Sequence, residues 1–455
     1  MSELLLLTPE LIVLAGAIVA LFADRITSRL RAAAHIGAPL ALVAALVAAL
    51  IGTHGGIFAG MLSLDSISVF ARVAIALLLA VWLCWISGRG TEGERSAEAV
   101  AFAMLSAVGG MLMVSARDLI VLFISLELST MPAYVLMGYR RDDERGLEGA
   151  LKYFLLSMLT SLIMLYGLSF AFGVSGSTAY ADLGAVSSGT LGQLAVTFVL
   201  VGLFAKLSAA PFHYWTPDAY AGAPASSVAY VSTVPKIAGV VALVQLVSAF
   251  SDNGGTITTV LVVGSLLSMI VGNLAAYPQT DLRRLMAYSG VAHSGYVLLA
   301  AAAGSSGGVA AVFYVIAYAV PSMAIMLLGA GEGTSLDELA GLAARRPAVA
   351  WASVAWLLSL VGIPPMVGFF GKLTMFTAAL DSGLLWIVIV AVMMSVVSAG
   401  YYFRILRAIF FGEHPGAGSK TRSLPTAIAY VVLTLATFAL GILASPVLEY
   451  FGLRL

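Results

Sequence analysis

Apolar stretches about as long as a membrane is thick recur along almost the whole chain, with short polar connections between them. The hydrocarbon core of a bilayer is about 30 Å thick, so a helix needs about 20 predominantly apolar residues to cross it. Only 10% of the 455 residues are charged and the mean hydropathy is +1.02, whereas a soluble domain carries about 25% charged residues. The sequence therefore predicts an all-α polytopic membrane protein.

Windows of high hydropathy give about fourteen expected transmembrane helices. They cover residues 4–23, 36–52, 66–87, 97–114, 119–139, 149–173, 194–218, 225–250, 256–277, 285–303, 308–329, 349–380, 384–411 and 426–445. The seventh window contains Pro211 and Pro217, and the twelfth contains the run Gly362-Ile363-Pro364-Pro365. Because proline removes a backbone hydrogen bond from a helix, we expect helices 7 and 12 to be broken.

The basic residues are distributed unequally between the two sets of connections. One set holds sixteen of the 23 lysines and arginines: Arg25, Arg29, Arg31, Arg89, Arg95, Arg140, Arg141, Arg145, Arg283, Arg284, Arg345, Arg346, Arg404, Arg407, Lys420 and Arg422. The other set, with the termini, holds only Arg117 and Arg454. Since cytoplasmic loops carry an excess of Lys and Arg, both termini are predicted on the outer side, which is the periplasmic side of the inner membrane in a bacterium.

Composition also argues against several classes of function. The formal net charge is zero, which gives no reason to expect a nucleic-acid partner. Cys84 is the only cysteine, so the chain has no internal disulfide and no four-cysteine cluster or zinc site. We expect no metal, no cofactor and no redox centre in this chain. The start Met1-Ser2-Glu3 lacks the basic segment of a cleavable signal peptide, so we expect residues 4–23 to be the first span.

Four charged residues fall deep inside apolar windows: Glu127, Lys206, Lys236 and Lys372. At a rise of about 1.5 Å per residue, the first three lie about 12, 18 and 15 Å from the start of their spans. A charge at the centre of a membrane helix costs on the order of 3 kcal/mol on insertion scales. Static ion pairing is one explanation for such a residue, but four together favour a function in ion transfer.

Prolines accompany these charges. Pro132 and Pro211 each lie five residues after Glu127 and Lys206, and Pro235 directly precedes Lys236. Interrupted helices inside a membrane are tolerated where they line a wet cavity, and ion transporters use them near the midplane. A lysine beside a carboxylate can then switch between holding and releasing a proton.

Four further ionisable residues allow either a structural or a functional role. His293 lies about 12 Å into the tenth window, where an imidazole is suited to passing protons or to simple hydrogen bonding with a hydroxyl. His213 lies near the cytoplasmic end, and a structural or gating role is favoured there. Lys152 and Arg72 lie close to predicted interfaces, so a structural role is as reasonable for them as a functional one.

Six sequence blocks resemble the antiporter-like subunits of respiratory complex I, and within that family the subunit N branch. They are LFISLELSTMPAYVLMGYRR, EGALKYFLLSMLTS, FAKLSAAPFHYWTPDAYAGAP, STVPKIAGV, QTDLRRLMAYSGVAHSGY and SLVGIPPMVGFFGKLTMF. The similar blocks cover roughly residues 115–300 and 355–375, and their order and spacing agree with the family. Pro321 in the eleventh window departs from the family pattern.

The resemblance implies a proton-translocating subunit of an NADH:quinone oxidoreductase. It implies that Glu127 and Lys206 form a coupled pair, that Lys236 is the central carrier, and that His293 connects it to Lys372; we call these five the relay residues. Lys152 would be an accessory near the site of proton uptake. Quinone, FMN and iron–sulfur clusters would belong to partner subunits, with subunits M and K as neighbours in the membrane arm.

The same resemblance implies two inverted five-helix repeats, formed by spans 4–8 and 9–13. The expected division is residues 1–114 for the N-terminal helices and the start of the first repeat, 97–250 for that repeat, 256–411 for the second and 412–455 for the C-terminal helix. Two other functions stay open. One is a subunit of a multi-subunit sodium/proton antiporter, and the other is an unrelated solute transporter whose substrate site uses Glu127 and the lysines.

Overall fold

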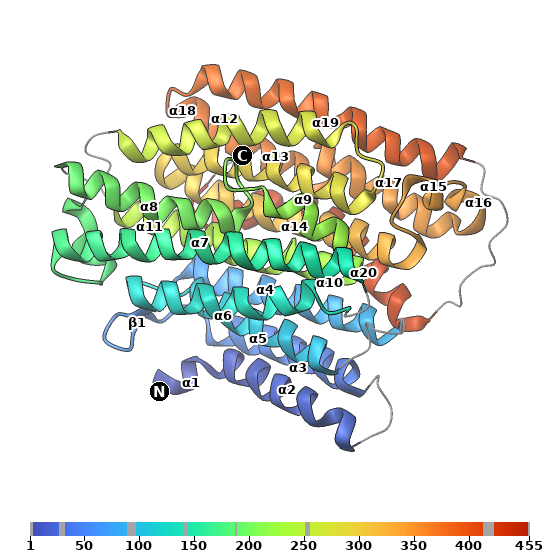
Figure 1. Ribbon diagram of the computed structural model, residues 1–455, viewed down its shortest axis with the longest axis horizontal. Coiled ribbons are helices and arrows are strands. Elements are labelled where there is room, and N and C mark those ends of the chain that lie inside the picture. Colours follow the sequence, from blue (N-terminus) through green and yellow to red (C-terminus); the bar gives the residue numbers. More distant parts are fainter. Residues whose placement is uncertain are drawn as a thin grey trace.

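The computed structural model describes residues 3–26, 32–88, 97–140, 143–186, 189–250, 255–412 and 423–453. Most of these residues lie in long helices packed side by side, with axes roughly horizontal in Figure 1. Within the described ranges, eleven helices are long and apolar enough to cross a membrane, and three shorter ones are also apolar. The prediction of an all-α polytopic membrane protein is confirmed.

The N-terminal part supplies the helices at one edge of the bundle (blue in Figure 1). Its elements are α1 (Glu3–Leu6), α2 (Thr8–Ile26), α3 (Ala32–Ile51), β1 (Gly55–Ile57), β2 (Leu62–Leu64), α4 (Ser66–Gly88) and α5 (Ala97–Met113). Strands β1 and β2 form an antiparallel hairpin that the sequence analysis did not predict, with Gly56 opposite Ser63. The turn between them uses positive φ angles at Phe58, Ala59 and Gly60, which a hydropathy scan does not detect.

The middle of the chain contains the first broken helix. Its elements are α6 (Leu119–Met137), α7 (Glu144–Ser175), the 3-10 helix η1 (Tyr180–Ala185), α8 (Gly189–Leu207), α9 (Trp215–Gly222), α10 (Ala225–Val231) and α11 (Val234–Ala249). The chain leaves helical geometry between Leu207 and Trp215, inside the seventh predicted window. The eighth window, expected to be one helix, is divided between α10 and α11, because Pro235 occupies the first turn of a new helix.

The C-terminal half ends with a helix that returns to the N-terminal part. Its elements are α12 (Thr256–Ala276), α13 (Leu282–Ala302), α14 (Gly304–Glu332), α15 (Leu336–Leu339), α16 (Leu342–Arg345), α17 (Pro347–Val361), α18 (Val367–Asp381), α19 (Leu385–Phe411), α20 (Leu424–Ile442) and α21 (Ala444–Tyr450). A second break separates α17 from α18, inside the twelfth window. Helix α14 continues through Pro321, so this departure from the family pattern does not break the helix.

Burial separates a central layer from a peripheral one. The apolar windows of α10–α11 and α14 are completely buried and that of α13 is 89% buried, whereas those of α3, α19 and α20 are 33% buried. The peripheral helices expose large apolar side chains such as Leu50, Val396 and Ile442. This arrangement suits a protein whose outer surface contacts lipid, and it places Lys236 and His293 in the centre of the bundle.

The two ends of the bundle differ in charge. In the described connections at the end that carries β1 (left in Figure 1), Arg117 is the single Lys or Arg. The opposite end carries Arg140, Arg145, Arg283, Arg284, Arg345, Arg346, Arg404 and Arg407. Of Arg25, only the backbone is described. The other basic residues used to predict orientation lie outside the described residues: Arg29, Arg31, Arg89, Arg95, Arg141, Lys420, Arg422 and Arg454. We refer below to the arginine-poor end and the arginine-rich end.

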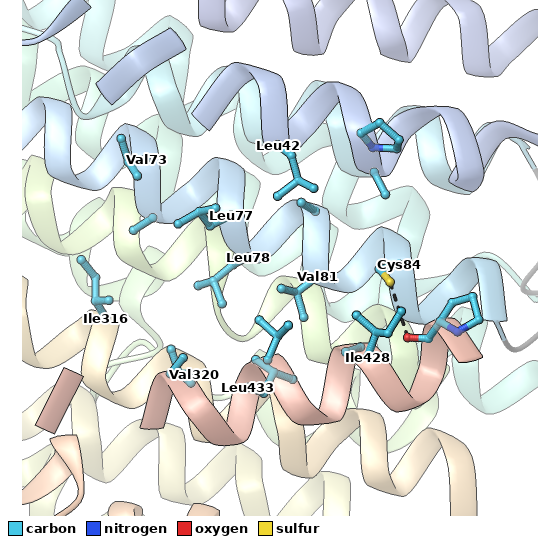
Figure 2. Close-up of a pocket in the computed structure, with 18 of the residues that line it drawn as sticks. Leu42, Val73, Leu77, Leu78, Val81, Cys84, Ile316, Val320, Ile428 and Leu433 are labelled. Carbon is cyan, nitrogen blue, oxygen red and sulfur yellow. Dashed lines mark hydrogen bonds between the residues drawn. The ribbon is translucent and has the colours of Figure 1, made fainter. Parts of the chain in front are cut away.

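A groove of about 650 Å³ lies between α3, α4, α14 and α20 (Figure 2). Leu42, Leu77, Val320 and Leu433 point into it, and Cys84 lies near one end. Its lining is almost entirely apolar and includes none of the relay residues. The groove is therefore suited to alkyl chains and not to the transfer of ions.

Candidate functional site

The break after α8 places Lys206 against α6. Lys206 lies in the last turn of α8, and its Nζ donates hydrogen bonds to Thr130 Oγ1 at 2.7 Å and to Ser129 Oγ at 3.4 Å. The residue Ser208, just after the helix, has a φ of 61°, a strained conformation for a residue with a side chain. The turn therefore ends the helix directly beyond Lys206 and keeps the ammonium group in contact with two hydroxyls.

Glu127 lies two residues before Ser129 and three before Thr130 on α6, but it does not form a direct ion pair with Lys206. Both carboxylate oxygens are buried, and within the described chain neither accepts a hydrogen bond. Glu127 still exerts a Coulomb attraction on Lys206. A buried carboxylate without a donor is costly, so Glu127 has unused hydrogen-bonding capacity among the described residues.

Lys236 is 5% exposed and lies at the start of α11, pointing towards α13. Its Nζ donates to the carbonyl oxygen of Gly290 at 3.2 Å and to Ser294 Oγ at 3.4 Å, and it lies 5.6 Å from the ring centroid of Tyr318. Ser294 Oγ in turn donates to the carbonyl oxygen of Leu207 at 2.5 Å. One hydroxyl therefore joins Lys236 to the break that directly follows Lys206.

His293 is 3% exposed and lies between two tyrosines from different helices. Its Nδ1 is hydrogen-bonded to the hydroxyl of Tyr314 on α14, and its Nε2 lies 3.0 Å from the hydroxyl of Tyr402 on α19. The Tyr402 hydroxyl also lies 2.5 Å from Ser289 Oγ. Both ring nitrogens thus have partners, as a group that accepts a proton on one side and releases one on the other requires.

Lys372 is 6% exposed and lies at the second broken helix. Its Nζ donates to the carbonyl oxygens of Leu360 and Val361 at 3.0 and 2.8 Å, and to Ser395 Oγ at 2.7 Å. The two carbonyls belong to the last turn of α17, where the negative end of the helix dipole stabilises a cation. Lys372 also lies 5.5 Å from the ring centroid of Tyr296, which packs edge-on against His293.

Lys152 lies apart from these buried groups. Its side chain is 43% exposed and forms ion pairs with Glu148 at 2.8 Å and Asp218 at 2.9 Å. Asp218 lies inside α9 and also pairs with Arg284 at 2.9 Å. This partly exposed cluster joins α7, α9 and α13 at the arginine-rich end. His213 is buried in the non-helical segment between α8 and α9, and its Nδ1 has no hydrogen-bond partner in the described residues.

Two buried ion pairs were not predicted from the sequence. Arg72, which we expected near an interface, donates from Nε and Nη2 to the carboxylate of Glu10 at 2.7 and 2.6 Å, and both side chains are buried. Arg346 and Glu332 form a second buried pair at 2.8 Å. An acidic residue in the first apolar window was the available signal for the Glu10 pair, because a charge there needs a partner.

The tyrosines around His293 were also missed. Tyr314 and Tyr318 lie four residues apart on α14 and therefore share one face, which His293 and Lys236 contact. Aromatic residues are ordinary in buried helices, so their spacing alone did not single them out. No cluster of three or more His, Cys, Asp or Glu side chains in the described residues could hold a metal ion.

The fold and the site define a class: a polytopic α-helical membrane protein with several ionisable side chains buried at its centre. The chain belongs to the family described as NADH:quinone oxidoreductase/Mrp antiporter, TM, which matches residues 116–398. Its relatives include proteins named NADH-quinone oxidoreductase subunit N, as the sequence blocks suggested.

The similarity to these relatives extends over nearly the whole chain. The subunit N of Jannaschia sp. (strain CCS1) is 35% identical over 100% of this chain and 97% of its own length. A subunit N 2 of Syntrophobacter fumaroxidans is 39% identical over 88% of this chain and 87% of its own length. The resemblance to the subunit N branch is confirmed.

Solved structures give the same result for the fold. A chain of respiratory complex I from Thermus thermophilus with bound Aureothin has a TM-score of 0.84 and 30% identity, covering 96% of this chain and 97% of that one. A chain of the Mrp complex from Dietzia sp. DQ12-45-1b has a TM-score of 0.86 and 25% identity, covering 99% and 96%. The fold is thus shared by complex I and Mrp assemblies.

Proposed function

We propose that this chain translocates protons as a membrane-arm subunit of a complex I-type NADH:quinone oxidoreductase. The observation that carries the proposal is a series of contacts that runs from the end of α8, beside Lys206, to Lys372. Ser294 contacts both Lys236 and the backbone carbonyl of Leu207, Tyr318 contacts both Lys236 and His293, and Tyr296 contacts both His293 and Lys372. Hydroxyls and buried cations in sequence are suited to stepwise proton transfer.

In this mechanism the charge on one relay residue sets the proton affinity of the next. A proton on Glu127 weakens its attraction for Lys206, which then releases its own proton towards Lys236, because an opposite charge nearby favours the charged form. Lys236 passes the proton through His293 to Lys372. Lys152 and Asp218, at the partly exposed arginine-rich end, would help protons reach Glu127.

The size of the central cavity supports protons over an organic solute as the transported species. The cavity beside Lys236 measures about 10 Å³, which is room for about one water molecule. A solute transporter that used these lysines would need a cavity as large as its substrate, whereas the apolar groove of about 650 Å³ contains none of them.

The proposal extends to topology and partners. We place fourteen spans in the inner membrane, with the arginine-poor end and both termini on the periplasmic side, and we assign residues 97–250 and 256–411 to two inverted repeats. Subunits M and K are the proposed neighbours. The quinone, FMN and iron–sulfur clusters would be bound by partner subunits, and this chain would contribute proton transfer to the enzyme without a redox centre of its own.

The second candidate is a subunit of a sodium/proton antiporter, favoured by the TM-score of 0.86 to a chain of an Mrp complex. Purification of the tagged chain from its native membranes in mild detergent separates the two. Quinone-site and iron–sulfur subunits with quinone reductase activity in the purified complex would support the first proposal. Partners without any redox centre would move the assignment to an antiporter, and a chain that is active alone would contradict both.

A further inference from the structure

Two cavities lie along one seam between α11, α13 and α14. The cavity of about 10 Å³ beside Lys236 is also lined by Val240 and Val297. A larger one, of about 320 Å³, lies at the arginine-poor end and is lined by Val244, Ser248, Ala301 and Gly308, among others. Helix α11 contributes Lys236, Val240, Val244 and Ser248, which follow one another at intervals of four residues and therefore lie on one face of the helix.

Helices α13 and α14 also line first the inner cavity and then the outer one towards the arginine-poor end. On α13, His293 and Val297 line the inner cavity and Ala301 lines the outer one; on α14, Tyr314 lines the inner cavity and Gly308 the outer one. The cavities are therefore stacked along the same seam. Val240 and Val244 are one turn apart, so the separation along α11 is about 6 Å at about 1.5 Å per residue.

The two cavities are separated by three valines, Val240, Val244 and Val297, whose side chains are 1%, 6% and 3% exposed. We call these three residues the apolar plug. Gly308 packs directly against it, since a Cβ atom at that position would lie 2.7 Å from Val244 Cγ1. A constriction of this kind conducts when water enters it and closes when it dries. The outer cavity, by contrast, has hydroxyls from Ser248, Thr258 and Ser305 in its lining.

We propose that this seam is a direct outward exit for protons from Lys236, separate from the path through Lys372. The Nζ–H bond of the Lys236 ammonium breaks, an O–H bond forms on a water molecule in the inner cavity, and the resulting hydronium passes the plug when it hydrates. Neutral Lys236 then regains a proton from the Lys206 side. This inference rests on the proposed function and adds a location and a gate for release.

Cysteine labelling tests the seam in the intact complex. Because Cys84 is the only cysteine of this chain, a Cys84→Ser background allows single cysteines at Ser248, Val244 or Val240. A small, membrane-impermeant methanethiosulfonate reagent is applied from the side of the arginine-poor end. Ser248→Cys should react at rest, and Val240→Cys should react several times faster during quinone reduction.

The control is Val241→Cys, which is equally buried on another face of α11. If Val240→Cys and Val241→Cys are labelled equally, and at a rate that does not change with turnover, the proposal is overturned.

A near-isosteric substitution gives a second test. Val244→Thr adds a hydroxyl to the plug, so the reconstituted complex should leak protons at rest, whereas Val241→Thr should not. Equal leak in the two variants would contradict the gate. If Lys236→Ala stops pumping while Val244→Thr has no effect, the exit fails and the proposed function stands; if the purified chain has no redox partners, the proposed function itself fails.

Discussion

The Nζ atom of Lys236 lies 3.4 Å from the hydroxyl oxygen of Ser294. The same hydroxyl donates to the carbonyl oxygen of Leu207, the residue that follows Lys206. One side chain from the second half of the protein therefore contacts both Lys236 and the backbone of the residue that follows Lys206. This hydroxyl is the point at which transfer between the two halves can be tested.

Ser294→Ala should slow proton pumping by about tenfold, since a hydrogen bond to a charged group is worth about 1.5 kcal/mol and that energy is about tenfold in rate. The measurement is the rate of proton uptake by proteoliposomes containing the complete complex. Ser265→Ala is the matched control, because Ser265 is also buried and also bonds to a carbonyl of α13, at Gly295, without touching a lysine. Equal losses in both variants would argue for a packing role.

The carboxylate of Glu127 should matter as a titratable group. Glu127→Ala should lower pumping by about a hundredfold, the lower end of the contribution of a positioned proton acceptor, and Glu127→Asp should lose much less. Pumping rates normalised to the amount of assembled complex provide the measurement. An equally severe loss in both variants would point to misassembly or strict geometry instead of titration.

The hydroxyl of Tyr402 should be required for transfer through His293. Tyr402→Phe leaves His293 Nε2 and Ser289 without a shared partner, so pumping should fall severalfold with assembly intact. Tyr401→Phe is the control, since Tyr401 is fully buried beside Tyr402 and its hydroxyl donates to Asn273 without touching His293. A Tyr402→Phe variant that pumps as well as Tyr401→Phe would remove Tyr402 from the path.

The pair formed by Glu10 and Arg72 should be structural. Removing one partner of a buried ion pair costs about 3–5 kcal/mol, whereas replacing both by apolar residues costs much less. Arg72→Met should therefore lower the thermal stability of the chain in detergent strongly, and the double variant Arg72→Met with Glu10→Leu should recover most of it. A double variant as unstable as the single one would show that the pair has another role.

The sequence predicted the class of fold and the buried charges well, for a physical reason. Charged residues such as Lys206, Lys236 and Lys372 are conspicuous in apolar windows. Pro211 and the run Pro364-Pro365 marked the two helix breaks, although α14 continues through Pro321. The connections between these charges were not predictable, because Ser294 and Leu207 are 87 residues apart and meet only through tertiary packing. Nor was the division between α10 and α11, since Pro235 is compatible with either a kink or a helix start.

The measurement that tests the central claim most directly is the number of protons pumped per electron by the complete complex carrying Lys236→Ala. The relay through Lys236 predicts that this ratio falls sharply and that quinone reduction slows with it, because the two are coupled. Normal assembly, shown by the full set of co-purifying subunits, is the necessary control. An assembled Lys236→Ala complex with the full ratio would contradict the role of Lys236 as the central carrier.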